Sequence, residues 1–369
     1  MTQVTAQPGQ AEASSSTSLK KYIHVPETKH ELNWADLVTL DLSQFDLPGG
    51  KEKLAAQLKD AVHRIGFFYI TNFGLTQDEI DRQFAIGKEL LELPEDEKLK
   101  HRADLEAGSY NGYRPLGSIE ILPGRRDNIE MYNVFKFVPQ YERTHPDVIH
   151  RHRDEIERFH RFIHEGIVYR LLRLIAIILE LPEDFLIPGH SYEGNSDCHL
   201  RYMIYRARSA EENAKFENLY SRGHTDFGSL TLLFRQPVAA LQVKTPEGEW
   251  KYVKPHPGSI TVNIADALQF WTNGYLKSSV HRVIAPPKDQ AHIDRLGVLY
   301  FVRPGDELDL KTVESPLLER EGFAGEEEEK SIKAGDWVRA RVRKNWEKPP
   351  ADRKENLVVG GVQTRIFHE

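Results

Sequence analysis

Two histidines and one aspartate have the side chains and the spacing of a metal centre. His224 and Asp226 are separated by one residue, and His281 lies 55 residues after Asp226. Two imidazoles and one carboxylate are the ligand set that holds non-haem Fe(II) on one face of its octahedron, with three positions left open. The chemistry that this set predicts is the activation of O2 at iron.

The elements around these residues decide whether they can meet, because the chain has four His-x-Asp sequences. Residues i and i+2 point to the same side of a strand but diverge on a helix. Only His224-x-Asp226 directly precedes a strand-like run, residues 229–234, and His281 opens another, residues 281–285. The other three sequences lie in a helical pattern or beside prolines: His145–Asp147, His152–Asp154 and His292–Asp294. The alternative for His224 and Asp226 is a buried pair in which each side chain satisfies the other.

A second histidine pair lies on a long helical pattern, residues 148–180. His160 and His164 are four residues apart and therefore share one helix face. In the zinc-protease motif a glutamate follows the first histidine, and here that position is Arg161. We expect His160 and His164 to be surface or capping histidines.

Short strand-like runs dominate the chain from about residue 200 to about residue 304. Eight of them, rich in β-branched and aromatic residues, alternate with glycine and proline turns. This pattern predicts an antiparallel sandwich or jelly roll. Helical patterns precede and follow it: 53–64, a segment capped by Thr76, 148–180 and 334–346. The expected fold class is mixed α/β with a β-rich core and with N-terminal and C-terminal helices packed around it.

Composition divides the chain into four predicted regions. Residues 1–20 are a polar segment rich in Ser, Thr and Gln and are expected to be a disordered tail. Residues 21–199 form an N-terminal region of helices and strands, in which 107–139 reads as loops and short strands. Residues 200–310 form the jelly-roll core, and 311–369 a C-terminal helical extension.

Charge and cysteine content exclude several partners. The formal net charge of −7 gives no basic excess for nucleic acid, and no apolar run is long enough to span a membrane. Cys198 is the single cysteine, so there is no intramolecular disulfide, which suits a reducing compartment. The predicted location is the cytoplasm, and the predicted partner is a small-molecule substrate.

Four stretches together resemble one enzyme family, the isopenicillin N synthase-like 2-oxoglutarate/Fe(II)-dependent dioxygenases. They comprise the metal motif, the distal-histidine motif, an N-terminal strand and a substrate-side loop: RGHTDFGSLTLL (222–233), NGYLKSSVHRV (273–283), GFFYI (66–70) and GYRPLG (112–117). The resemblance extends from about residue 36 to residue 345. It implies a distorted double-stranded β-helix, also called a jelly roll, wrapped by helices.

The resemblance also implies 2-oxoglutarate as co-substrate. Its far carboxylate needs a cation, and arginine provides two parallel hydrogen bonds. In the family this arginine opens an Arg-x-Ser motif, for which the candidate here is Arg295, with Gly297 at the serine position. Tyr205 matches the tyrosine of the family's Asn-x-Tyr-Pro motif, although Met203 and Arg206 replace its asparagine and proline. The alternatives are a surface ion pair of Arg295 with Asp294 or Asp289, and a plain core position for Tyr205.

The implied enzyme uses Fe(II), 2-oxoglutarate and O2. His224, Asp226 and His281 would be its metal ligands and catalytic centre. It would hydroxylate, desaturate or cyclise a small organic substrate, a specialised metabolite, and release succinate and CO2. Two alternatives remain open: an iron oxidase of the isopenicillin N synthase type without 2-oxoglutarate, and a non-catalytic jelly-roll binding protein.

The substrate-side residues are expected to be aromatic with a few polar groups, as small organic ligands prefer. The candidates are Tyr110, Asn111, Tyr113, Arg114, Tyr132, Phe227, Phe270 and Trp271. Each of them has a core position as its alternative. Arg114 and Arg222 are candidates for an acidic substrate, with plain surface charge as the alternative.

Overall fold

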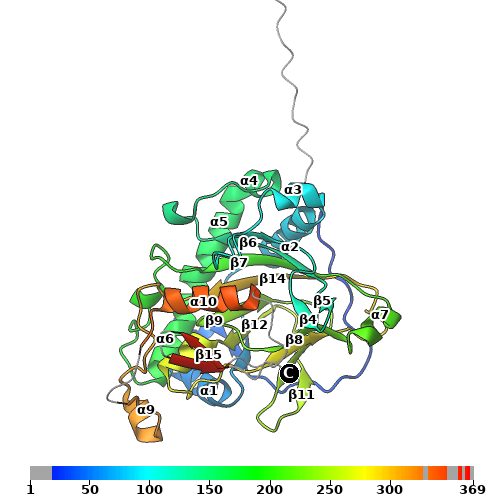
Figure 1. Cartoon of the computed structure of the whole chain (residues 1–369). Helices are drawn as coiled ribbons and strands as arrows, with labels where there is room; N and C mark the ends of the chain where they lie inside the picture. The colour runs from blue at the N-terminus through cyan, green and yellow to red at the C-terminus, as the bar shows by residue number, and fades with distance from the viewer. Residues whose placement is uncertain (1–18, 327–330, 347–355, 360–361, 366–369) are drawn as a thin grey trace, which may run out of the picture.

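Two β-sheets form the centre of the protein (Figure 1). The computed structural model describes residues 19–326, 331–346, 356–359 and 362–365. The larger sheet has eight strands in the order β1 (Thr39–Asp41), β2 (Phe67–Thr71), β12 (Ser259–Ile264), β9 (Leu230–Phe234), β14 (Arg295–Val302), β7 (His199–Tyr205), β6 (Ile129–Phe135) and β3 (Gly112–Arg114). The smaller sheet has the order β11 (Trp250–Tyr252), β10 (Leu241–Lys244), β13 (His281–Ile284) and β8 (Leu219–His224).

Alternation along the central strands separates two cores. In β7, Leu200, Tyr202 and Ile204 belong to the cluster that includes the helices. Met203 and Tyr205 belong instead to a second cluster between the two sheets. Successive side chains of a strand point to opposite faces, and both faces of β7 are buried. The second face is therefore the one that can line a site.

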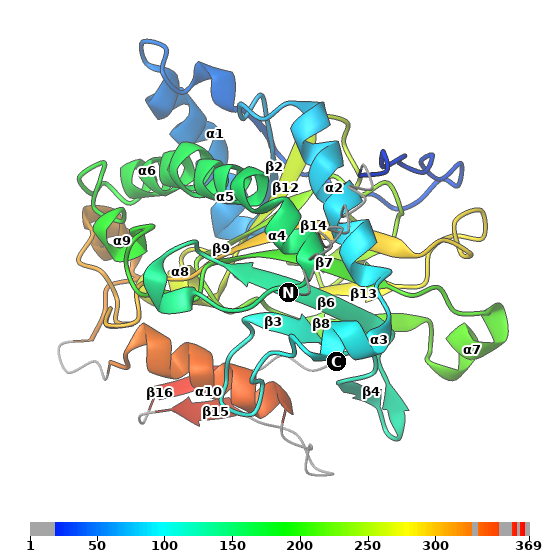
Figure 2. The same ribbon diagram turned by 90° about the horizontal axis from the view of Figure 1, so that it is seen from above.

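The longer N-terminal helices pack on the outer face of the large sheet. Figure 2 shows α1 (Gly50–Arg64), α2 (Gln77–Leu91), α5 (Arg153–Phe162) and α6 (Tyr169–Ile178) on one side, and α10 (Ala334–Trp346) on the other. Thr76 caps α2, as the sequence predicts, and its side chain and that of Glu79 form a reciprocal capping box. The shorter helices are α3 (Glu95–Leu99), α4 (Asp147–Arg151), α7 (Ala210–Lys215), α8 (Asp266–Trp271), α9 (Pro316–Glu321), η1 (Leu42–Gln44), η2 (Pro139–Tyr141) and η4 (Pro188–His190).

The long helical pattern of residues 148–180 is interrupted by a π-helical turn, η3 (Ile163–Val168), between α5 and α6. His160 and His164 are fully buried there, so the expectation of surface or capping histidines is wrong. His164 Nδ1 lies 2.8 Å from the Tyr300 hydroxyl of β14, and His160 Nδ1 lies 3.4 Å from the same hydroxyl. The residues around His160 and His164 in the sequence are largely apolar. They give no sign that Tyr300, on a distant strand, provides a hydrogen-bond partner.

The jelly-roll prediction is confirmed, and the N-terminal region contributes to it directly. Strands β1, β2, β3 and β6 from that region join the same sheet as the later strands. The seven-residue strand β6 falls in the stretch that the sequence suggests is loops and short strands. Two hairpins complete the fold, β4 (Glu120–Leu122) with β5 (Arg125–Arg126) and β15 (Asn356–Val359) with β16 (Val362–Arg365).

The four-region division stays a prediction, and the tail assigned to residues 1–20 lies almost wholly outside the described residues. The hairpin of β15 and β16 was not foreseen in the C-terminal helical extension. Among the described residues, no helix has the length and hydrophobicity that a membrane span requires.

Candidate active site

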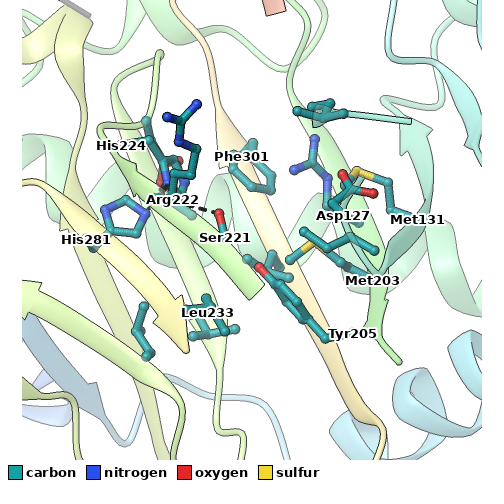
Figure 3. Close-up of a pocket in the computed structure, with 18 of the residues that line it drawn as sticks. Asp127, Met131, Met203, Tyr205, Ser221, Arg222, His224, Leu233, His281 and Phe301 are labelled. Atoms are coloured by element: carbon teal, nitrogen blue, oxygen red, sulfur yellow. Dashed lines mark hydrogen bonds and ion pairs between the residues drawn. The ribbon is translucent and has the colours of Figure 1, made fainter. Parts of the chain in front are cut away.

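A cavity of about 320 Å³ lies between the two sheets. Its walls come from both of them, with Leu299 and Phe301 of β14 on the large sheet and Ser221 of β8 and Val283 of β13 on the small one. Figure 3 shows His224 and His281 on one wall, with Tyr205 and the other labelled residues of the large sheet facing them. The space between the sheets is therefore a site accessible to a small molecule.

The structure brings His224, Asp226 and His281 together at the edge of this cavity. Antiparallel pairing of β8 and β13 places His224 opposite His281, and their ring centroids are 4.4 Å apart. Asp226 follows two residues after the end of β8. Its Oδ1 lies 3.9 Å from His224 Nε2 and 3.8 Å from His281 Nε2. One ligand atom from each residue lies within 4.8 Å of the others, a separation that one metal ion can bridge.

Backbone carbonyls orient the two imidazoles. His224 Nδ1 lies 2.8 Å from the Arg222 carbonyl, and His281 Nδ1 lies 3.1 Å from the Ser279 carbonyl. A carbonyl only accepts, so each Nδ1 carries the proton and each Nε2 keeps its lone pair. Metal-binding histidines are held in this way, with the second nitrogen donating to a carbonyl or carboxylate. Both Nε2 atoms face Asp226, so the donor set fits a divalent metal.

The charge state of these groups also suits a metal. Burial lowers the pKa of His281 to about 4, so its imidazole is neutral at neutral pH. Burial would raise the pKa of Asp226, but the two imidazoles and hydrogen bonds from Thr231 and Asn263 lower it to about 2. Asn263 Nδ2 donates to Asp226 Oδ2 at 3.1 Å. A neutral imidazole and an ionised carboxylate are the forms that bind metal.

The loop after Asp226 is fixed by backbone bonds and by a required glycine. The Asp266 amide at the start of α8 donates to the Asp226 carbonyl at 2.9 Å, and the Ala267 amide donates to the Gly228 carbonyl at 2.7 Å. Gly228 has φ +143°, and a Cβ there would lie 2.6 Å from Arg303 Nη1. Only glycine combines this backbone conformation with so close an approach.

Arg295 and Tyr205 are neighbours in the cavity wall. They pair directly in the register of β14 and β7, and the Arg295 guanidinium carbon lies 5.5 Å from the centre of the Tyr205 ring. Arg295 is only 4% exposed, lines the cavity, and makes no ion pair among the described residues. Asp294 and Asp289, its candidate surface partners, bond Arg206 and Thr28 instead. The surface ion pair considered for Arg295 is therefore wrong.

Three of the eight candidate substrate residues line the cavity, namely Tyr110, Arg114 and Phe227. The other five lie outside its lining, which corrects their expected position: Asn111, Tyr113, Tyr132, Phe270 and Trp271. Tyr113 and Tyr132 sit on the alternate face of β3 and β6, where their hydroxyls bond Glu130 and His145, each at 2.8 Å.

The side chains of the remaining three residues make contacts outside the cavity. Trp271 Nε1 donates to the Asp309 carbonyl at 3.2 Å, and Asn111 Nδ2 donates to the Tyr141 carbonyl at 3.3 Å. Phe270 packs edge-on against Trp337, with ring centroids 5.8 Å apart. Side-chain type suggested these residues, but strand parity and helix packing decide which side they face.

Sequence reasoning missed Arg201, Arg303 and Arg341, which also line the cavity. A signal for two of them was present. Arg201 is four residues before Tyr205 on β7, and Arg303 is eight residues after Arg295, just past the end of β14. An even spacing on one strand places side chains on one face, so both share the cavity face with the predicted co-substrate residues.

Fold and site together define a jelly-roll protein with a candidate non-haem metal centre between its sheets. Two family models match the chain: the 2OG-Fe(II) oxygenase superfamily over residues 195–304, and the non-haem dioxygenase in morphine synthesis N-terminal family over residues 37–155. The chain belongs to the 2OG-Fe(II) oxygenase superfamily. It is an oxidoreductase, a 2-oxoglutarate-dependent dioxygenase whose cofactors are Fe(II) and 2-oxoglutarate.

Relatives and solved structures agree with this family. The chain is 33% identical to the UPF0676 protein of Schizosaccharomyces pombe, over 82% of this chain and 90% of that protein. It is 30% identical to a 2-oxoglutarate-dependent dioxygenase of Didymella fabae, over 73% and 90%. A Neurospora crassa protein crystallised with alpha-KG shares the fold, with a TM-score of 0.73 and 23% identity over 87% of this chain and 99% of that one.

Proposed function

We propose that His224, Asp226 and His281 hold the Fe(II) of this dioxygenase. The observation that carries the proposal is the convergence of the Nε2 atoms of both histidines on the Asp226 carboxylate at the cavity edge. Two imidazoles and one carboxylate match the preference of non-haem iron and leave positions open for other ligands. Among the described residues, no other group of histidine, cysteine and acidic side chains has this geometry.

We infer that Arg295 and Tyr205 bind the far carboxylate of 2-oxoglutarate. Arg295 is a buried cation without an acidic partner in the described part of the chain. Burying such a charge is costly unless an anion pairs with it. A carboxylate satisfies a guanidinium with two parallel hydrogen bonds, and the adjacent Tyr205 hydroxyl is a further donor. Where the family has a serine, Gly297 contributes no hydroxyl, so the arginine and the tyrosine carry this role here.

Bound iron and 2-oxoglutarate supply the activation of O2, coupled to decarboxylation of 2-oxoglutarate to succinate and CO2 and to oxidation of a substrate C–H bond. The chain's own residues orient the reactants and limit water. Arg295 and Tyr205 fix one end of the co-substrate. Apolar side chains also line the cavity, among them Ile129, Met131 and Leu299, and they exclude water from the surface that they cover.

The substrate is proposed to be a small specialised metabolite that is hydroxylated, desaturated or cyclised. A cavity of about 320 Å³ holds a compound of that size. Relatives carry names that fit this class, among them a proline hydroxylase of Petromyces alliaceus and a 2-oxoglutarate-dependent dioxygenase of Glarea lozoyensis.

Succinate release tests the proposal. Wild-type protein supplied with Fe(II), 2-oxoglutarate and O2 should produce succinate, including slow release without substrate. His224→Ala should release none. His292→Ala is the matched control, because His292 is exposed and belongs to another His-x-Asp sequence; its succinate yield should equal that of wild type. Succinate from His224→Ala at the wild-type rate would contradict the metal assignment, and substrate oxidation without succinate would indicate an oxidase that needs no 2-oxoglutarate.

A further inference from the structure

Two arginines face the cavity from the end of the large sheet that lies beside Asp226. Arg201 comes from β7, and Arg303 immediately follows β14. Their guanidinium carbons lie 4.2 Å and 5.7 Å, respectively, from the centre of the Phe301 ring, so the two cations flank one aromatic side chain. Figure 3 shows Phe301 on the large-sheet side of the cavity, opposite His224 and His281.

Neither of these cations forms an ion pair within the described part of the chain. Arg303 is only 3% exposed, and its Nε has no hydrogen-bond partner. The carboxylates of Asp226 and Asp197 act on Arg303 only from a distance. Desolvation in the cavity lowers the pKa of Arg201 to about 10, which still leaves it charged at neutral pH. Two like charges near each other in a poorly solvated space favour the binding of an anion.

Two other arginines of the cavity have acidic partners. Arg114 pairs with Asp127, and both side chains are 1% exposed. Arg341 Nη1 lies 3.2 Å from Asp266 Oδ2.

Arg126 and Arg222 also line the cavity without an acidic partner among the described residues. Arg126 is exposed and donates to the Gly117 and Ser118 carbonyls, and Arg222 comes from β8 on the small sheet. Arg201 and Arg303 are therefore the unpaired cations on the large sheet at the end away from Arg295.

Neutral neighbours hold Arg201 in position. Arg201 Nε donates to Asn133 Oδ1 at 2.7 Å, and the Asn133 amide donates to the Tyr110 carbonyl at 2.7 Å. The Arg201 guanidinium also lies 5.6 Å from the centre of the Tyr110 ring. These contacts orient the guanidinium without neutralising it.

Arg303 is held as firmly. Its guanidinium lies 4.2 Å from the centre of the Phe227 ring and packs against the backbone of Gly228. Phe227 and Gly228 directly follow the metal-ligand candidate Asp226 in the chain. A group bound to Arg303 would therefore lie on the same side of the cavity as the metal centre.

We propose that the substrate is an organic acid whose carboxylate binds Arg201 and Arg303, with its carbon skeleton against Phe227, Phe301 and Tyr110. This inference rests on the proposed function, since it assigns the substrate class of the same cavity. A carboxylate matches the planar guanidinium donors, and the rings provide apolar surface for the rest of the molecule.

Calorimetric titration of the full-length protein with matched acids and amides tests this inference. The probes are benzoate and benzamide, phenylacetate and phenylacetamide, and cinnamate and cinnamamide. Each is titrated anaerobically with and without Fe(II) and 2-oxoglutarate. At least one acid should bind about tenfold or more tightly than its amide, because a charge-assisted pair is lost in the amide. Equal binding within every pair, or no binding of any acid, would overturn the proposal.

Substitutions then locate the anion. Arg201→Gln and Arg303→Gln should each remove most of the preference for acid over amide while leaving the Kd of 2-oxoglutarate within about twofold. Arg161→Gln is the matched control, because Arg161 also stacks on an aromatic ring, Tyr192 at 4.0 Å, but lies outside the cavity. If Arg303→Gln fails to fold, Arg201→Gln carries the test, since the residue Arg201 as a whole is only partly buried.

The two proposals fail in different ways. An acid preference that persists in Arg201→Gln and Arg303→Gln would overturn the substrate inference alone. If the wild-type protein neither binds 2-oxoglutarate nor releases succinate but still prefers acids to amides, the proposed function is contradicted. The anion site at Arg201 and Arg303 would remain supported.

Discussion

Two pairs of histidines differ in how their ring nitrogens are used: His164 with His190 on the helix side of the large sheet, and His224 with His281 on the small sheet across the cavity. On the helix side, His164 lies between the Tyr300 hydroxyl at 2.8 Å and the His190 carbonyl at 2.6 Å. His190 in turn lies between the Leu186 carbonyl at 2.7 Å and the Ser229 hydroxyl at 2.6 Å. Every ring nitrogen of His164 and His190 has a hydrogen-bond partner, so neither imidazole has a nitrogen left to bind a metal.

On the cavity side, His224 and His281 have only one nitrogen each bonded to a carbonyl, and the other faces Asp226. The difference teaches that burial and proximity do not make a metal site. Free nitrogens that converge on an anion do, and hydrogen bonding decides which nitrogens are free.

The largest expected effect comes from removing the anion of the cavity pair. Asp226→Ala should reduce turnover by more than the roughly 100-fold found when only an orienting partner of a metal ligand is lost. His164→Ala on the helix side should instead lower stability by about 1–3 kcal/mol, because it leaves buried polar partners unpaired. Succinate yield per folded protein, with urea unfolding as the stability measure, separates the two. If folded Asp226→Ala and folded His164→Ala lost turnover to a similar extent, the proposed difference between the cavity side and the helix side would be wrong.

Arg295→Gln is expected to have the next largest effect, on the co-substrate rather than on the metal. Hydrogen bonds to a charged group contribute about 1.5–3 kcal/mol, so the KM for 2-oxoglutarate should rise about 10- to 100-fold. Arg295→Lys should recover part of this loss, since it keeps the charge but not the paired donors. Steady-state kinetics with 2-oxoglutarate varied gives the result. An unchanged KM in Arg295→Gln would place the far carboxylate elsewhere.

Asn263→Ala tests the support of the metal ligand. The Asn263 amide donates to Asp226 Oδ2 at 3.1 Å and leaves the other oxygen free. Its removal should weaken Fe(II) affinity by about tenfold without abolishing turnover at saturating iron, as for other residues that orient a ligand. Anaerobic metal titration measures the shift. Full loss of activity at saturating Fe(II) would show that Asn263 does more than orient the carboxylate.

The smallest expected effect is the pH dependence of the helix-side pair. Burial lowers the pKa of His164 and of His190 to about 4, below the ordinary value of 6.5. The unfolded chain therefore takes up protons first as the pH falls, and stability decreases between about pH 6.5 and about pH 4. One pKa unit corresponds to about 1.4 kcal/mol, so each histidine should account for about 1–2 kcal/mol between about pH 7 and about pH 5.

Urea unfolding at the two pH values measures this dependence, with His164→Phe as the comparison. That variant should lose less stability on acidification than wild type, whatever its stability at neutral pH. An identical pH dependence in both proteins would mean that His164 is not held neutral by the fold.

The convergence of His224, Asp226 and His281 was predictable from two short motifs beside strand-like runs. The pattern placed His224 only before the run 229–234, whereas in the structure His224 ends β8 and Asp226 lies in the loop between β8 and β9. Arg295 and Tyr205 were suggested by the family resemblance alone, and it is the register of β14 and β7 that places them side by side. The roles of these five residues stay predictions. The fold class was predictable from the spacing of the strand-like runs.

The lining of the cavity was less accessible from sequence. Tyr113 and Tyr132 have suitable side chains but the wrong strand parity, and no local signal says which face of β3 or β6 is inside. Arg201 and Arg303 are an even number of residues from Tyr205 and Arg295. This spacing predicts that they face the cavity only once Tyr205 and Arg295 are known to do so. Long-range pairing, rather than side-chain type, determines this part of the site.

The central claim is that the cavity pair and Asp226 form one Fe(II) site beside a 2-oxoglutarate site. Anaerobic titration of the protein with Fe(II) in the presence of 2-oxoglutarate tests it most directly, because 2-oxoglutarate chelated to iron gives a visible charge-transfer band. The account predicts a band that saturates at one Fe(II) per chain in wild type and in His292→Ala and that is absent in Asp226→Ala. A band of equal intensity in Asp226→Ala, or no band in wild type, would contradict it.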